Sequence, residues 1–298
     1  MSSVWQTIRR SFVLLTFLWL SAAQAAVPDT PAKGVLYKAQ SGERTLYLFG
    51  SVHLARESFY PLPDSFEQAY RAADTVVVET DPSDTQAMMQ AAPMMVYPGS
   101  EKLEQHLRPA TWKKLQQQTG GQTAGFQMMR APVVATALIS QLFSSDQFSA
   151  AQGIDLYVIR RAREDKKDLQ QLESMAFQIQ QLVDLSDAEA DEMLSQTLDS
   201  LRDGSAKRET EQLLTAWVRG DEQKLAQIFA ASAARDAGSR KMLKRLLDDR
   251  NVTMTEKIEQ LVQSGRQVLV VVGAGHLVGA RSIPDLLRQR GYRITRVK

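Results

Sequence analysis

Residues 267–276 are Gln-Val-Leu-Val-Val-Val-Gly-Ala-Gly-His, a continuous apolar run that ends in two glycines and a histidine. An apolar run without alternation is typical of a strand that is buried on both faces of a sheet. A second strand is predicted over residues 45–49, and it is followed in the same way by Gly50 and His53. The two Gly-x-x-His turns therefore predict a buried sheet with a histidine just beyond the carboxyl end of each of two strands.

The residues around the second run extend this sheet. Residues 35–39 and 45–49 flank Ser41-Gly42-Glu43 and predict a β-hairpin. A helical pattern over residues 64–73 leads into the β-branched run at 75–79. Strand, helix and strand in this order predict a right-handed crossover in a parallel or mixed sheet.

The long middle of the chain, residues 84–264, is mostly helical in pattern. A short strand at 169–172 interrupts the helices, and an edge strand is expected at 292–297 after an amphipathic helix at 281–290. We therefore predict an α/β fold in which a mixed sheet is built from the N- and C-terminal segments, with a large helical insertion between them. The whole forms one domain over residues 26–298.

Local signals mark boundaries inside the helical insertion. Ser186-x-x-Glu189 and Thr253-x-x-Glu256 have the form of capping boxes, each of which predicts the start of a helix. Pro132 is expected to kink or break the apolar segment 126–143, because proline lacks the N–H that a helix interior needs.

The first 25 residues have the layout of a secretory signal peptide. Arg9 and Arg10 precede an apolar run at 12–20, and Ala23-x-Ala25 supplies small residues for cleavage after Ala25. The run is shorter than the roughly 20 apolar residues that span a bilayer, so an uncleaved anchor is the weaker alternative. We expect a periplasmic or secreted protein without an integral membrane segment after cleavage.

Composition excludes several classes of site. The chain has 36 Lys and Arg against 34 Asp and Glu, and residues 1–25 contain two of the arginines and no acid. The predicted mature protein is thus balanced in charge, which argues against a nucleic-acid partner. No cysteine is present, so thiolate metal ligands and disulfides are excluded.

Two imidazoles and a carboxylate are expected at the same edge of the sheet. His53 and His276 each follow a predicted strand, and Glu79 ends a third. Two histidines and a glutamate are the ligands of a catalytic zinc-type site, and they suit manganese or cobalt as well. Such an ion would acidify a bound water and polarise a carbonyl. The alternative is that each histidine caps its strand end and binds a loop.

Seven short motifs along the chain resemble those of one known family. They are Gly50-Ser51-Val52-His53-Leu54, the sequence Phe-Tyr-Pro-Leu-Pro at 59–63, Val78-Glu79-Thr80-Asp81, Gly153-Ile154-Asp155, Leu172-Glu173, Asp249-Arg250-Asn251 and the closing motif at 273–279. In order and spacing they are similar to the TraB/GumN family, from about residue 35 to residue 297. That family includes the Tiki proteins, metal-dependent peptidases with paired Gly-x-x-His motifs, and a plasmid protein that restrains peptide-pheromone signalling.

The resemblance implies roles for particular residues. His53, Glu79 and His276 match the core site positions and would hold a divalent ion (manganese, cobalt or zinc). Glu173 is the candidate general base, and Arg250 and Asn251 match further site positions. The chain departs from the usual Glu-Thr-x-Glu pattern, because Glu173 is followed by Ser-Met-Ala and the second acid is missing.

Arg250 has two open interpretations: it could orient a substrate carboxylate, or it could pair with Asp248 or Asp249. His106, the third histidine of the chain, is expected at the surface.

We therefore expect a periplasmic metal-dependent hydrolase that acts on a peptide or protein substrate. The alternative is a non-catalytic protein that sequesters a peptide or a small ligand such as haem through the same histidines. Other enzyme classes lack their signatures, since the chain has no Gly-x-Ser-x-Gly and no His-Glu-x-x-His.

Overall fold

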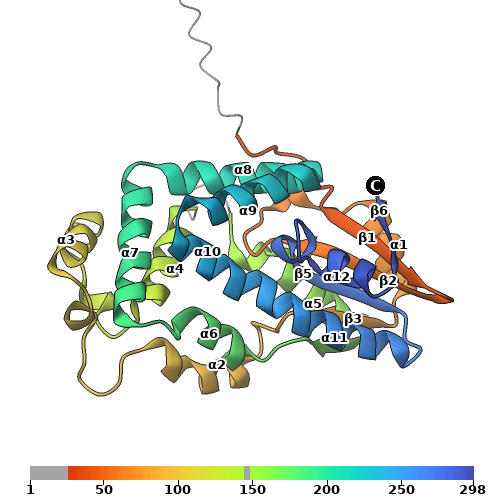
Figure 1. Cartoon of the computed structure of the whole chain (residues 1–298), viewed down its shortest axis with the longest axis horizontal. Coiled ribbons are helices and arrows are strands. Elements are labelled where there is room, and N and C mark those ends of the chain that lie inside the picture. The colour runs from red at the N-terminus through yellow and green to blue at the C-terminus, as the bar shows by residue number, and fades with distance from the viewer. Residues whose placement is uncertain (1–25, 144–147) are drawn as a thin grey trace, which may run out of the picture.

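The computed structural model describes residues 26–143 and 148–298, so the predicted signal peptide at 1–25 lies outside the described residues. A six-stranded mixed sheet has the strand order β4-β3-β5-β2-β1-β6. Helices lie on both sides of it, with α11 and α12 in front and α5 behind, and helices such as α3, α4 and α7 extend to one end (Figure 1). The predicted α/β class with a mixed sheet is confirmed.

The strands lie within a residue or two of their predicted positions. They are β1 (Val35–Ser41), β2 (Arg44–Ser51), β3 (Thr75–Val78), β4 (Asp168–Gln171), β5 (Val268–Gly273) and β6 (Arg293–Val297). β4, β3, β5 and β2 are parallel, and β1 is antiparallel to both β2 and β6. In the central strand β5 every residue except the last is buried. It lies between β3, which precedes Glu79, and β2, which precedes His53.

Several helices pack on the sheet, among them α1 (Asp64–Ala72), α5 (Ile154–Glu164), α11 (Asp249–Gln263) and α12 (Ile283–Gln289). The other helices are α2 (Thr85–Ala91), α3 (Pro109–Gln118), α4 (Ala131–Leu142), α6 (Met175–Val183), α7 (Asp187–Arg202), α8 (Ser205–Arg219), α9 (Glu222–Arg235) and α10 (Ala237–Leu243). The helical insertion therefore contributes one strand, β4, to the sheet.

Two of the three predicted helix boundaries are confirmed. Ser186 caps α7 through a capping box with Glu189, and Pro132 is the second residue of α4, where a proline costs no hydrogen bond. The boundary predicted at Thr253 is wrong. Thr253 lies inside α11, because α10 continues through a π-helical segment, Lys244–Asp248, directly into α11.

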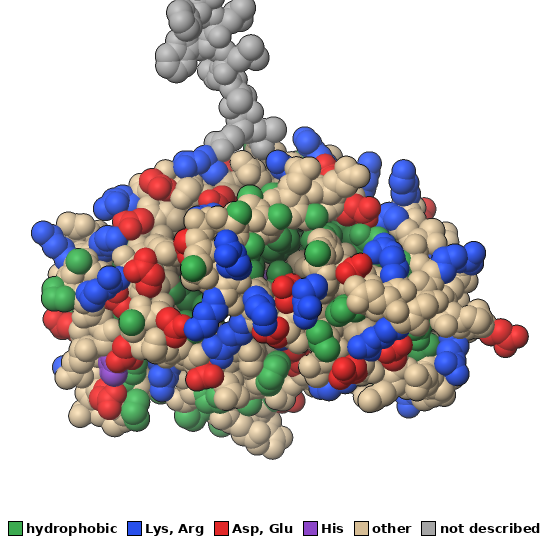
Figure 2. All heavy atoms as spheres, viewed as in Figure 1, with side chains coloured by type: hydrophobic (Ala, Val, Ile, Leu, Met, Phe, Trp, Pro, Cys, Tyr) green, Lys and Arg blue, Asp and Glu red, His purple; other side chains and the backbone are tan. Residues whose placement is uncertain are grey.

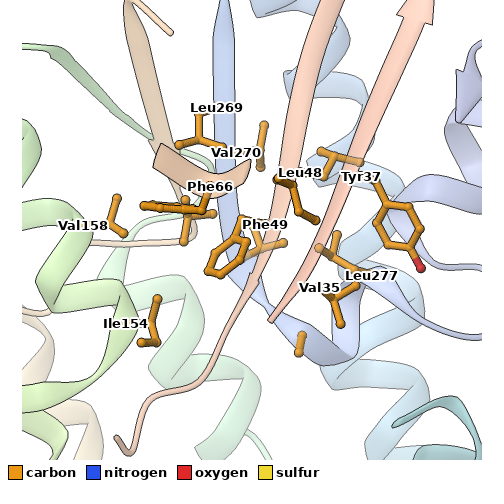
Figure 3. Packing of buried hydrophobic residues seen from close by; sticks show 14 of the residues in the cluster. Val35, Tyr37, Leu48, Phe49, Phe66, Ile154, Val158, Leu269, Val270 and Leu277 are labelled. Atoms are coloured by element: carbon orange, nitrogen blue, oxygen red, sulfur yellow. The ribbon is translucent and has the colours of Figure 1, made fainter. Parts of the chain in front are cut away.

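A tryptophan joins the helical part to the sheet. Trp217 of α8 is completely buried, and its ring packs against Phe49 and Phe59 at centroid distances of 6.5 and 5.7 Å. Its indole N–H donates to the carbonyl of Gly50, just before the turn that carries His53. Figure 3 shows Phe49 beside Phe66, Ile154 and Val158 in this core, so α1 and α5 pack on the same strand.

The surface is mixed in charge. On the face drawn in Figure 2, basic and acidic side chains are interspersed over the helices. Because the two signs are interspersed, their fields largely cancel at a distance from this face. Within the described ranges, no helix has the length and apolar character needed to cross a membrane.

Replacing Trp217 with Phe tests the link between α8 and β2. The variant keeps an aromatic ring but leaves the buried Gly50 carbonyl without its donor, so we expect a loss of about 1–3 kcal/mol in the free energy of unfolding. Urea titration followed by circular dichroism measures it. Trp112→Phe is the matched control, because Trp112 is only partly buried and packs on a separate cluster. Equal losses in both variants would contradict the role of the hydrogen bond.

Candidate functional site

Four chemically active side chains follow the four parallel strands. His53 follows β2, Glu79 follows β3, Glu173 follows β4 and His276 follows β5. Because these strands are parallel neighbours, their carboxyl ends meet at one edge of the sheet. We call these four residues the strand-end cluster. The predicted convergence of three strand ends is confirmed, and β4 adds a fourth.

His276 is the buried imidazole of the cluster. It lies in a short 3-10 helix, Ala274–Leu277, and is 3% exposed. Its Nδ1 lies 2.6 Å from Oδ1 of Asn251, whose amide nitrogen donates to the carbonyl of Arg281. The amide thus presents its oxygen to His276, so Nδ1 carries the proton and Nε2 keeps its lone pair. Burial lowers the pKa of His276, which favours this neutral form.

Glu79 lies directly in front of that lone pair. Its Oε1 is 3.5 Å from Nε2 of His276 and accepts a hydrogen bond from the Gly273 N–H at 2.6 Å. Its Oε2 accepts from Arg250 at 2.7 Å and from Gln178 at 3.1 Å. Both oxygens are therefore fixed in position by donors from three separate elements.

The pKa of Glu79 keeps it ionised. Burial alone would raise this pKa, but charge on His276, Arg250 and His53, together with the Gly273 N–H, lowers it to about 2. Because the pKa of His276 is itself lowered, Arg250 and His53 supply the positive charge when His276 is neutral. His53 is thus close enough to Glu79 for its charge to act on the carboxylate.

Arg250 is the counter-ion of two carboxylates. Its Nη2 donates to Glu79 and, at 2.6 Å, to Glu173, and its Nε donates to Glu173 at 3.0 Å. Its Nη1 donates to the Leu246 carbonyl in the π-helical segment. Burial lowers the pKa of Arg250, but the two carboxylates outweigh it and raise that pKa. Arg250 pairs with neither Asp248 nor Asp249, which bind Arg281 and Lys244 instead.

His53 is the exposed imidazole, and its side chain is 76% exposed. Its Nδ1 lies 2.7 Å from Oδ2 of Asp155, and the other oxygen of Asp155 accepts from the Ser51 hydroxyl. Nε2 has no hydrogen-bond partner among the described residues. The charge and hydrogen bond of Asp155 outweigh desolvation and raise the pKa of His53 to about 9. Because water screens a pair this open to solvent, about 9 is the upper limit of the rise.

Two glycines allow the close contacts of the cluster. A Cβ on Gly153, just before α5, would lie 2.5 Å from the His53 carbonyl oxygen. A Cβ on Gly273 would lie 3.1 Å from Oε1 of Glu79, against the hydrogen bond that holds this carboxylate. A side chain at either position would push the cluster apart, which explains why glycine stands there.

Three residues of the site were missed by sequence reasoning as functional partners. Asp155 and Ser51 support His53, and Gln178 donates to both Glu79 and Glu173. Asp155 does lie in the Gly-Ile-Asp motif, but no spacing links it to a histidine 102 residues away. His106 lies at the surface, as expected, although only 17% of its side chain is exposed. It stacks on Tyr97 at 3.9 Å and binds Glu101 and Asp187.

The cluster fits a divalent ion in part. Two ligands of a tetrahedral ion lie about 3.3 Å apart when metal bonds are about 2.0–2.1 Å, and Nε2 of His276 and Oε1 of Glu79 are 3.5 Å apart. A lone pair beside a carboxylate oxygen is unfavourable, and either a proton on Nε2 or a cation between the two atoms would make the contact favourable. No group of three or more His, Asp or Glu at metal-ligand spacing occurs in residues 26–143 and 148–298. To share one ion with Glu79 and His276, His53 would have to lie closer to them than it does here.

The fold and the cluster define an α/β protein with imidazoles and carboxylates at the ends of its parallel strands. The model of the TraB/PrgY/gumN family matches residues 35–296, and the chain belongs to this family. It is 27% identical over 256 residues to the uncharacterized protein YbaP of Escherichia coli (strain K12), covering 83% of this chain and 89% of YbaP.

More distant relatives carry the name of an enzyme. The chain is 23% identical over 299 residues to metalloprotease TIKI1 of Danio rerio and 24% identical over 298 residues to TIKI2 of the same organism. Each match covers 83% of this chain, but only 60% of TIKI1 and 57% of TIKI2. No solved structure matches the chain significantly.

The state of His53 can be tested in metal-free protein. Below about pH 9 we expect the ring to carry its charge, because Asp155 raises the pKa of His53. In the Asp155→Asn variant the carboxylate charge beside His53 is removed, so the pKa of His53 should fall towards about 6.5. Proton–nitrogen NMR titration measures both, with His53→Gln assigning the signal. Glu164→Gln, on the same helix, is the control and should leave the titration unchanged. An unaltered titration in Asp155→Asn would contradict the pairing.

Proposed function

We propose that this protein is a metal-dependent hydrolase that cleaves peptide bonds in the periplasm. The observation that carries the proposal is the pair formed by His276 and Glu79. A neutral imidazole directs a lone pair at an ionised carboxylate 3.5 Å away, and a divalent cation between them would satisfy both. The two relatives named metalloproteases support the same reading of the cluster.

The proposed ligands are His53, Glu79 and His276. Bound there, a zinc, manganese or cobalt ion would acidify a water molecule and polarise the carbonyl of the substrate. Asn251 would fix the ring of His276 with Nε2 towards the ion, as outer partners of metal-bound histidines commonly do. Asp155 would do the same for His53, so that each ring offers Nε2.

Glu173 is the proposed general base. It lies beside Glu79, because both carboxylates share Arg250 and Gln178. Both oxygens of Glu173 accept hydrogen bonds from Arg250, so transfer of a proton to Glu173 requires the Arg250 contact to loosen. Arg250 itself would position both carboxylates and balance their charge.

One observation favours the alternative of a sequestering protein. Both oxygens of Glu173 already accept from Arg250, and the second acid of the family pattern is replaced by Ala176. A site without a working base would bind a peptide and not cleave it.

The two glutamates should fail differently when each is changed to Gln. Glu79→Gln replaces a charged ligand with a weak neutral one, so metal content should fall. Glu173→Gln should keep the metal but lose on the order of 10²–10⁴-fold in turnover. Metal analysis and hydrolysis of a fluorogenic peptide library measure the two effects, and Glu57→Gln at an exposed position is the control. Wild-type turnover in Glu173→Gln would disprove the base assignment. Peptide binding without hydrolysis in every form would establish the sequestering alternative.

Export has a separate test, motivated by the charged start, the apolar run at 12–20 and Ala23-x-Ala25. The protein recovered from the periplasmic fraction should begin at or near Ala26, because signal peptidase cuts after small residues. N-terminal sequencing measures this, and Ala25→Leu is expected to slow cleavage. Intact Met1 in the membrane fraction would contradict the proposal.

A further inference from the structure

The edge strand β4 has a free side, and its carboxyl end lies at the strand-end cluster. β4 pairs with β3 on one side, and no strand of the described chain pairs with its other side. The N–H groups of Asp168 and Leu172 donate to residues on the β3 side. Because the direction alternates along a strand, the backbone groups of Leu169 and Gln171 point away from the sheet. An edge of this kind can pair with another extended chain.

A cavity of about 470 Å³ borders this edge. Residues 170–172 form one wall, and Lys257, Gln260, Leu261 and Ser264 of α11 and the following turn form the other. We call it the β4–α11 groove. Its walls combine apolar surface, to which Leu172 and Leu261 contribute, with amide, hydroxyl, ammonium and guanidinium groups, the last from Arg266. Such walls offer hydrogen-bond donors and acceptors to a peptide backbone, and apolar surface to its side chains.

Each wall of the groove continues along the chain to a residue at the strand-end cluster. On the strand side, Leu172 is followed by Glu173. On the helix side, Arg250, Lys257, Leu261 and Ser264 are spaced by seven, four and three residues, so they share one face of the helix. The groove therefore continues the stripe that starts at the buried Arg250. A larger cavity, of about 840 Å³ between α7 and α10, contains no residue of the cluster.

We propose that the β4–α11 groove binds the peptide substrate as an added strand along β4. The extended chain pairs its backbone with the outward groups of Leu169 and Gln171, and α11 covers its side chains. The bond to be cleaved then lies beyond Leu172, at the strand-end cluster. This inference rests on the proposed function, because it names how the substrate of that site is held.

The first test uses backbone methylation of the ligand, which leaves the protein unchanged. The probe is a fluorescein-labelled peptide of twelve residues, chosen from a random library by retention on the immobilised protein. Each backbone nitrogen is methylated in turn, and fluorescence anisotropy gives the Kd. A strand donates from alternate residues on its paired side, so we expect a loss of affinity of about tenfold or more at every second position. A uniform effect, no effect, or no retained peptide would overturn the proposal.

The second test blocks the groove from the exposed side of the helix. Gln260→Trp should weaken binding of the probe about tenfold or more, because the indole fills the space beside β4. Gln263→Trp is the matched control, since Gln263 is exposed on the same helix but does not line the groove. Equal affinity in both variants would overturn the groove.

Failure of the groove and failure of the hydrolase are distinguishable. If the Gln260→Trp variant still hydrolyses peptide at the wild-type rate, the proposed binding groove is wrong and the proposed hydrolase activity stands. Alternating loss of binding without any hydrolysis supports the groove and overturns the enzyme.

Discussion

The guanidinium of Arg250 holds together two buried carboxylates that would otherwise repel one another. Glu79 and Glu173 end adjacent strands, and Arg250 reaches both from α11. Removing one partner of a buried pair typically costs about 3–5 kcal/mol, because the remaining charge is left without compensation. The rest of the site depends on this contact, since it fixes Glu79 in front of His276 and holds α11, which carries Asn251, against the strand ends.

The sheet topology explains why these groups meet at all. Four parallel strands end at one edge, and β4, which comes from the helical insertion, brings Glu173 beside Glu79. The two imidazoles are held differently. Asn251 supports the buried His276, whereas Asp155 supports the open His53. One ring is therefore rigid and dry, and the other lies where a ligand or substrate can reach it.

Much of this could be predicted because strand ends are local features of a sequence. The apolar run before His276 and the β-branched run before Glu79 place both residues without knowledge of the fold. The partners of these residues could not be predicted in the same way. Nothing in the sequence around Thr253 shows that α10 continues into α11 through a π-helical segment, so the predicted boundary there is wrong.

The sequence by itself determined the α/β class, the family pattern and the three residues His53, Glu79 and His276 at strand ends. Periodicity and glycine turns are written in neighbouring residues, so they can be recognised locally. Only the tertiary structure decided that Arg250 binds Glu79 and Glu173, and that Asp155 binds His53 across 102 residues. Those pairings depend on which helix lies against which strand end, and burial, rather than local propensity, selects them.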